Sequence, residues 1–238
     1  LCSLFIVIIL LIPMNSFDKF FYRFFPTPSF FGTSSFGLDI GDESLKFLEL
    51  VNTKNGLRVG RYGEYAILPG VIELGRIKNS KSIEEILLKL RNEIGLRSAR
   101  VSLPETQVYL FRLRLEKLGL VNIRESIEFA LEEHVPLQAS GAIFDYEIIY
   151  EDTQSIELQV ATIPKNVIES YLSIFQNAGI IVQSFELEAQ AISRAVVKKG
   201  DLGTYMIVDF GEKRTGIFII SRGVVMFTST LDVGGVML

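Results

Sequence analysis

The chain has very few of the side chains that bind transition metals or act as strong nucleophiles. Among 238 residues there is one cysteine, Cys2, and one histidine, His134. These counts exclude an intrachain disulfide, a cysteine-based zinc site and a multi-histidine metal site. Serine–histidine–aspartate catalysis would depend on His134 alone, and we expect a structural role for it near a helix C-terminus. The remaining acidic groups, hydroxyls and backbone amides suit nucleotide and magnesium chemistry better than acyl transfer.

An excess of positive charge is also missing. The sequence has 24 Lys and Arg against 28 Asp and Glu, which gives a net charge of −4, and it contains no long basic run. Nucleic acid is therefore not an expected partner. Apolar residues make up 48% and charged residues 22%, as in ordinary globular proteins, so the length fits one large domain or two small ones.

No apolar run is long enough to cross a membrane. Residues 4–12 are apolar and end at Pro13, whereas a spanning helix needs about 20 such residues. No Lys or Arg precedes Lys19, so the positive segment of a signal peptide is lacking. We expect Met14 to be the natural start and residues 1–13 to be translated upstream sequence. A truncated membrane anchor is the alternative.

Phenylalanines dominate residues 16–25. Their spacing places them on one face of a helix: Phe17, Phe20, Phe21, Phe24 and Phe25. Such a helix could lie on a membrane surface or in the groove of a partner, or it could dock on the protein itself. Pro26 and Pro28 end it, and residues 32–35 form a joint, so residues 1–35 are expected to be separate from the body.

Strands and helices alternate along the rest of the chain, which predicts a mixed α/β fold. A capping box at residues 82–85 is expected to open the first helix, and Gly95 to end it. The predicted strands are 36–51 with a turn at 41–44, then 57–68, 100–103, 108–115, 144–150, 155–163, 180–185, 204–210, 216–221 and 224–230. The further predicted helices follow Asn122 and cover 166–177 and 188–198.

Two segments have the same pattern of a strand, an Asp-x-Gly turn and a returning strand. We call them the first phosphate loop (residues 38–46) and the second phosphate loop (residues 208–215). Glycine allows a tight turn that directs backbone N–H groups toward a phosphate, and a nearby hydroxyl adds a donor. An aspartate at the strand end can hold Mg²⁺ through water. Each turn alone is common, but the pair predicts a site for a magnesium-bound polyphosphate.

Four stretches together resemble the PilM family of bacterial type IV pilus assembly, within the actin, sugar kinase and Hsp70 superfamily. They are FGLDIGDESLKFLEL, IRESIEFALEEHVPL with the following FDYEII, ELEAQAISRA, and YMIVDFGEKRTGIFIISRGVVMFTSTLDVGG. The second stretch is the most specific, because it is similar to the inserted subdomain of that family and matches sugar kinases poorly. The resemblance implies an actin-like, ribonuclease H-like ATPase fold with an inserted small α+β subdomain and an incomplete second half.

The resemblance also implies ATP and Mg²⁺ as cofactors and assigns residues to their site. Asp39 and Asp209 correspond to the magnesium-side aspartates, and Glu188 to a position on the connecting helix. The other positions expected to bind nucleotide are Gly41, Ser44, Lys46, Gly211, Thr215, Gly234 and Gly235. One departure from the family lies at the tip of the second phosphate loop, where Glu212, Lys213 and Arg214 are bulky and charged. No catalytic residue is identified.

The resemblance further implies how the chain is divided and what it does. The expected units are a first actin-like subdomain (36–108), the inserted subdomain (109–178), a return to the first (179–199) and the start of the second (200–238). The implied function is a nucleotide-binding scaffold of type IV pilus assembly, or of related secretion or competence assembly, at the cytoplasmic face of the inner membrane. Within the pilus inner-membrane assembly complex it would bind a short N-terminal peptide of a PilN-like membrane protein.

Two other functions remain open at this point: an FtsA-like division protein, and an ATPase or small-molecule kinase of the same superfamily. In the family, further sequence follows Gly235, so we expect the chain to be a fragment or the product of an interrupted gene, and to bind ATP poorly and be inactive. The full-length protein is expected to be at most a slow ATPase.

Overall fold

The computed structural model describes residues 36–54, 56–117 and 122–237. The expectations for Met14, for residues 1–13 and for the phenylalanine-rich segment 16–25 lie outside these residues. Within them, no helix is both long and apolar enough to cross a membrane.

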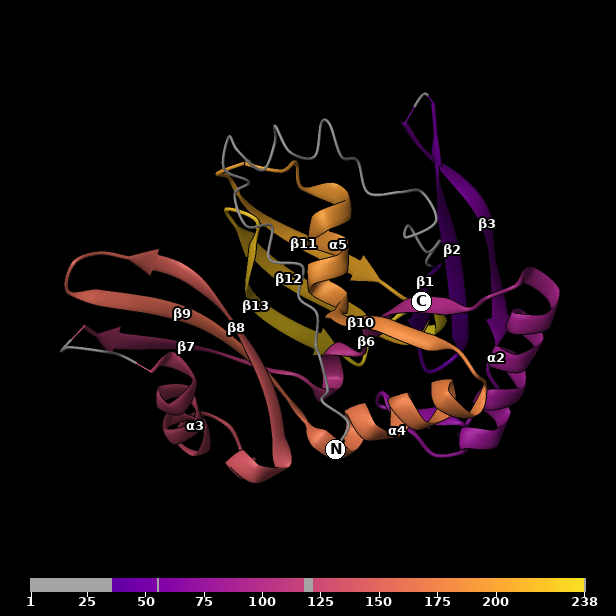
Figure 1. The fold of residues 1–238 in the computed structure, drawn as a ribbon, viewed down its shortest axis with the longest axis horizontal. Helices are drawn as coiled ribbons and strands as arrows, with labels where there is room; N and C mark the ends of the chain where they lie inside the picture. Colours follow the sequence, from indigo (N-terminus) through magenta and orange to yellow (C-terminus); the bar gives the residue numbers. More distant parts are fainter. Residues whose placement is uncertain (1–35, 55, 118–121, 238) are drawn as a thin grey trace, which may run out of the picture.

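A five-stranded sheet forms the centre of the first unit (Figure 1). Its strand order is β10-β6-β1-β2-β3, with β1 parallel to β6 and β6 parallel to β10, while β2 and β3 run antiparallel as a hairpin. The strands are β1 (Phe36–Ile40), β2 (Ser44–Thr53), β3 (Gly56–Ala66), β6 (Ser98–Leu103) and β10 (Ile181–Leu187). Parallel pairing of β10 with β6 confirms that the chain returns to this sheet after a long excursion.

Helices α2 (Ser80–Ile94) and α4 (Lys165–Asn177) pack against each other and share the main apolar core with the sheet. The expected capping box at residues 82–85 is wrong, because α2 begins earlier. Asn79 is its N-cap, and the Asn79 side chain accepts a hydrogen bond from the Ser82 N–H. Gly95 ends the helix in the left-handed conformation, with φ 68°, as predicted. A two-stranded hairpin that the sequence did not predict, β4 (Ile72–Glu73) with β5 (Arg76–Ile77), precedes α2.

The inserted unit is a three-stranded antiparallel sheet, in the order β7-β9-β8, with one helix (Figure 1). Its elements are β7 (Tyr109–Glu116), α3 (Ile123–His134), β8 (Ala142–Glu151) and β9 (Ser155–Pro164), and short 3₁₀ turns precede β7 (Glu105–Gln107) and β8 (Ala139–Gly141). It has its own apolar core, which includes Ile127, Leu131 and Leu158.

Helix α4 packs with the first unit and not with the inserted unit, although the family resemblance placed the end of the inserted unit at Ala178. The apolar side of α4, including Tyr171, Ile174 and Phe175, is fully buried in the main core. The expected boundary therefore moves to the end of β9. An amphipathic pattern identifies the buried face of a helix but not the core that receives it.

The last part of the chain begins a second sheet. Helix α5 (Glu188–Val196) leads to the antiparallel meander β11 (Thr204–Phe210), β12 (Thr215–Ser221) and β13 (Val224–Leu231), followed by a 3₁₀ turn (Gly235–Met237). Phe218, Ile220 and Val225 are buried together with Ala189 of α5. The alternation of strands and helices confirms the mixed α/β class.

Candidate functional site

The two phosphate loops have the same turn geometry. In the first, the Gly41 N–H donates to the Ser44 carbonyl at 2.9 Å, and in the second the Gly211 N–H donates to the Arg214 carbonyl at 2.8 Å. A Cβ atom at Gly211 would lie only 2.8 Å from the Arg214 oxygen, so this turn requires glycine. At Gly41 the corresponding contact would be 3.6 Å, which is ordinary packing.

Asp39 and Asp209 come from different sheets and interact with each other. Asp39 lies on β1 opposite Ser102 of β6 and Lys46 of β2, and Asp209 lies on β11. Burial raises the pKa of the Asp39 carboxyl, and repulsion by Asp209 adds to this, while Lys46 and a hydrogen bond with Ser102 oppose it. The fold therefore brings the two predicted aspartates together, as the paired loops suggested.

Glu188 joins these aspartates as the first residue of α5, directly after β10. Burial raises its pKa to about 7, with further contributions from the charges of Asp39 and Asp209 and from a hydrogen bond with Asp209. A carboxyl group with this pKa is half protonated at neutral pH.

Glu105 is a fourth acidic residue beside the site, and the sequence did not indicate it. It lies just past the end of β6, 7% exposed, and both carboxyl oxygens are buried without a hydrogen-bond partner among the described residues. Burial raises its pKa to about 8, and the charge of Glu188 adds to the effect. Three of these four acidic side chains, those of Glu188, Glu105 and Asp39, thus lie at the C-terminal ends of the neighbouring strands β10, β6 and β1. This is the position where α/β sheets bind ligands.

These side chains fit magnesium held through water better than a metal bound by several carboxylates. Within the described residues, no group of three or more acidic, histidine or cysteine side chains is placed to hold a metal ion. Asp39 and Asp209 form a pair of neighbouring carboxyl groups, and the charge of Lys46 lowers the pKa of Asp39 against the effect of burial. Mg²⁺ retains several waters and needs only one or two carboxylates besides a phosphate ligand, so this pair is compatible with it.

The remaining predicted residues surround the two loops. Ser44 begins β2 half-buried, and Lys46 is exposed. Thr215 is buried, and its hydroxyl donates to the Val233 carbonyl at 2.6 Å, so its hydrogen is already engaged within the protein.

Gly234 and Gly235 pack under the tip of the second phosphate loop. The Gly235 N–H donates to the Gly211 carbonyl at 3.1 Å. A Cβ atom at Gly234 would lie 2.4 Å from the Glu212 carbonyl oxygen. The pair therefore supports the loop from below.

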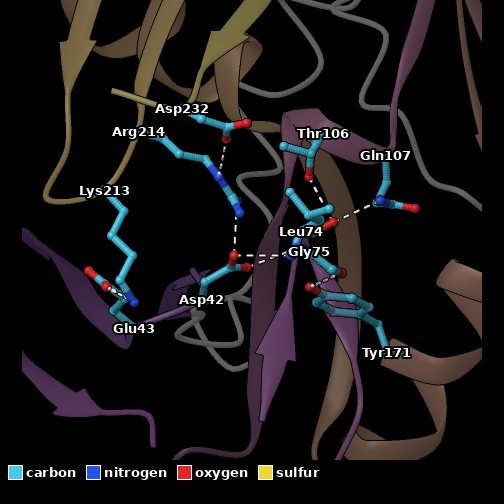
Figure 2. Close-up of polar contacts among 10 residues, drawn as sticks. All are labelled: Asp42, Glu43, Leu74, Gly75, Thr106, Gln107, Tyr171, Lys213, Arg214 and Asp232. Atoms are coloured by element: carbon cyan, nitrogen blue, oxygen red, sulfur yellow. Dashed lines mark hydrogen bonds and ion pairs between the residues drawn. The ribbon is translucent and has the colours of Figure 1, made fainter. Parts of the chain in front are cut away.

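Side chains at the tips of the two loops form ion pairs with each other (Figure 2). Lys213 Nζ contacts Glu43 Oε1, and Arg214 Nη1 lies 2.9 Å from Asp42 Oδ2. The bulky residues that depart from the family pattern thus connect the two halves of the site. This contact joins residues far apart in sequence, and no local pattern could have revealed it.

Solved structures with a similar fold support an actin-like architecture. The PilM–PilN type IV pilus biogenesis complex matches with a TM-score of 0.73 and 16% identity, over 85% of this chain and 62% of that chain. The cytoplasmic domain of EpsL, an inner-membrane component of the type II secretion system of Vibrio cholerae, matches with a TM-score of 0.55 and 10% identity, over 84% and 71%. The ethanolamine utilization protein EutJ from Carboxydothermus hydrogenoformans matches with a TM-score of 0.51 and 14% identity, over 87% and 54%.

These likenesses confirm the mixed α/β, actin-like ATPase fold, and the chain spans less than two thirds of the PilM–PilN chain that it matches. No curated protein sequence matches the chain. A family model described as type IV pilus assembly protein PilM matches residues 37–238. The chain therefore belongs to the PilM family of type IV pilus assembly proteins.

Proposed function

We propose that the chain is the nucleotide-binding part of a pilus-assembly scaffold that binds ATP with Mg²⁺ between its two phosphate loops. The observation that carries this proposal is the meeting of Asp39 and Asp209 from separate sheets, each beside an Asp-x-Gly turn of the same geometry. The backbone N–H groups of such turns bind phosphate oxygens, and the aspartates hold hydrated Mg²⁺ beside them. ATP supplies a polyphosphate whose charge the metal partly neutralises.

Most of the predicted residues have a distinct role in this proposal, whereas the Thr215 hydroxyl is engaged with the Val233 carbonyl and is given none. Asp39 and Asp209 orient the waters of the metal, while Gly41 and Gly211 allow the backbone to approach the phosphates. Lys46, placed opposite Asp39, contributes positive charge, and Ser44 contributes a hydroxyl. Gly234 and Gly235 hold the second loop in position through the Gly235–Gly211 hydrogen bond.

Slow ATP hydrolysis is a second candidate activity, and Glu188 is the observation that favours it. Its pKa of about 7 leaves part of the population ionised at neutral pH, next to both aspartates. A carboxylate with such a pKa can accept a proton from a water that attacks a phosphate. We propose that nucleotide binding matters more than hydrolysis, because a scaffold needs only the bound nucleotide to bias its conformation.

The proposed partner is the N-terminal peptide of a PilN-like inner-membrane protein. The similar structure is a PilM–PilN complex, and family membership places the chain in pilus assembly. We propose that the inserted unit borders the peptide groove and that the protein works at the cytoplasmic face of the inner membrane, in the pilus assembly complex.

The test is a titration of the full-length protein with a fluorescent peptide that corresponds to the N-terminus of the PilN-like protein encoded with it. Saturable binding of this peptide, with no binding of a scrambled peptide of the same composition, supports the scaffold function. Absence of binding both with and without Mg²⁺·ATP would contradict it. A change in affinity on adding nucleotide would support the conformational role of ATP.

A further inference from the structure

We propose that the side chains of Lys213 and Arg214 bind phosphate in this site. When no polyphosphate is bound, they form ion pairs with Glu43 and Asp42 instead. The inference rests on the proposed nucleotide site and adds to it two ligand-binding side chains and the carboxylates that compete for them. The ligand class is a polyphosphate, such as the triphosphate of a nucleotide.

The four residues lie at the tips of the two phosphate loops. Figure 2 shows Lys213 and Arg214 reaching from the second phosphate loop toward Glu43 and Asp42 of the first. Glu43 and Asp42 follow Gly41 directly, and Lys213 and Arg214 lie two and three positions after Gly211. The cations are therefore at the loop tips, beside the turns whose backbone N–H groups are expected to meet phosphate.

The site has more acidic than basic side chains beside the expected phosphates. The site contains Asp39, Asp209 and Glu188, whose mutual repulsion contributes to the raised pKa values of Asp39 and Glu188. In the part of the chain that the structure describes, Lys46 is the one cation that lowers the pKa of these two groups. A triphosphate would bring several more negative charges, and one Mg²⁺ neutralises only part of them. Lys213 and Arg214 supply two further positive charges close to the same turns.

Lys213 can readily exchange Glu43 for a phosphate group. The Lys213 side chain is 57% exposed and the Glu43 side chain 27%. The hydrogen bond with Lys213 lowers the pKa of Glu43 and raises that of Lys213, so both groups are charged at neutral pH. Ion pairs exposed to this extent contribute little stability, so a polyphosphate needs to displace only a weak competitor.

Asp42 has other hydrogen-bond donors besides Arg214. Asp42 Oδ2 also accepts from the Leu74 N–H and Asp42 Oδ1 from the Gly75 N–H, both at 3.0 Å. If Arg214 turned to a phosphate, Asp42 would keep these two hydrogen bonds. Arg214 would also leave Asp232, which is 84% exposed and can be hydrated. A guanidinium matches phosphate oxygens in a two-pronged geometry, which favours this exchange.

The experiment measures binding of inorganic tripolyphosphate to the full-length protein by calorimetry, at low and at physiological salt. Glu43→Gln removes the competitor, and we expect it to increase the affinity about 3- to 10-fold. Lys213→Gln removes the cation, and we expect a loss of similar size. Glu151→Gln is the matched control, because it breaks the Lys117–Glu151 ion pair (2.7 Å) in the inserted unit and should leave the affinity unchanged.

The outcomes separate this inference from the proposed function. If Lys213→Gln increases the affinity as Glu43→Gln does, the ion pairs only hold the two loops together and the inference is wrong. It is equally wrong if neither substitution changes the affinity while Mg²⁺·ATP still binds and Asp39→Asn abolishes that binding. If neither the unchanged protein nor Glu43→Gln binds tripolyphosphate or Mg²⁺·ATP, both the inference and the proposed nucleotide site fail.

Discussion

Arg214 and Asp42 link the two phosphate loops through a contact of 2.9 Å between Arg214 Nη1 and Asp42 Oδ2. The same aspartate accepts hydrogen bonds from the backbone of Leu74 and Gly75, at the turn between β4 and β5. The Gly75 carbonyl in turn accepts from the buried Tyr171 hydroxyl of α4 at 3.1 Å (Figure 2). A continuous set of polar contacts therefore connects the second phosphate loop with the main core.

Replacement of Asp42 by alanine should destabilise the protein. Two backbone N–H groups and Arg214 would lose their acceptor, and we expect a decrease of about 1–3 kcal/mol in the free energy of unfolding. Asp232→Ala is the control, because the Asp232 side chain pairs with the same arginine but is 84% exposed, so its removal should cost less than about 0.5 kcal/mol. Chemical denaturation measures both, and equal losses would contradict the role assigned to Asp42.

Glu105 should make the stability of the protein depend on pH. Its pKa is about 8 in the folded state against 4.5 for a free side chain, so the folded protein binds the proton more tightly. The contribution of this group is fully present below pH 4.5 and is lost as pH rises through 8, with a slope of at most about 1.4 kcal/mol per pH unit. Glu105→Gln should therefore gain stability relative to the unchanged protein as the pH rises from about 4.5 to about 8.

Glu133→Gln, which removes an exposed carboxyl group of α3, is the matched control for this measurement. Denaturation curves at several pH values give the comparison. A parallel pH dependence in Glu105→Gln and the unchanged protein would show that Glu105 does not hold its proton in the folded state.

Gly234 and Gly235 allow a comparison of two adjacent glycines. A Cβ atom at Gly234 would lie 2.4 Å from the Glu212 carbonyl oxygen, whereas at Gly235 the nearest atom is 3.9 Å away. Gly234→Ala should move the second phosphate loop, weaken nucleotide binding and cost about 1–3 kcal/mol of stability. Gly235→Ala should change both properties little. Thermal unfolding and nucleotide titration measure the difference, and the opposite ranking would contradict the packing described.

Much of this architecture follows from local sequence patterns. The Asp-x-Gly turns at Asp39 and Asp209, the Asn122 cap and the Gly95 stop each depend on neighbouring residues, so each can be predicted. Glu188 was assigned from resemblance, and the structure places it beside both aspartates.

Other features depend on the tertiary structure. Glu105 lies in the short turn after β6, where a Leu-Pro-Glu sequence indicates the end of a strand and nothing about burial. The Lys213–Glu43 and Arg214–Asp42 pairs form only when two sheets meet, so from the sequence these charges could be seen only as a departure from the family. The apolar stripe of α4 predicts that one face of this helix is buried. It does not predict that this face packs in the main core and not in that of the inserted unit.

The two phosphate loops are proposed to form one magnesium-dependent nucleotide site, and calorimetry of ATP binding to the full-length protein is the experiment that tests this proposal. We expect saturable ATP binding that requires Mg²⁺ and is weakened at least about tenfold by Asp39→Asn, because the metal waters lose a carboxylate. Asp152→Asn, in the β8–β9 turn, should leave binding unchanged. ATP binding that is independent of Mg²⁺ and unaffected by Asp39→Asn would contradict the account.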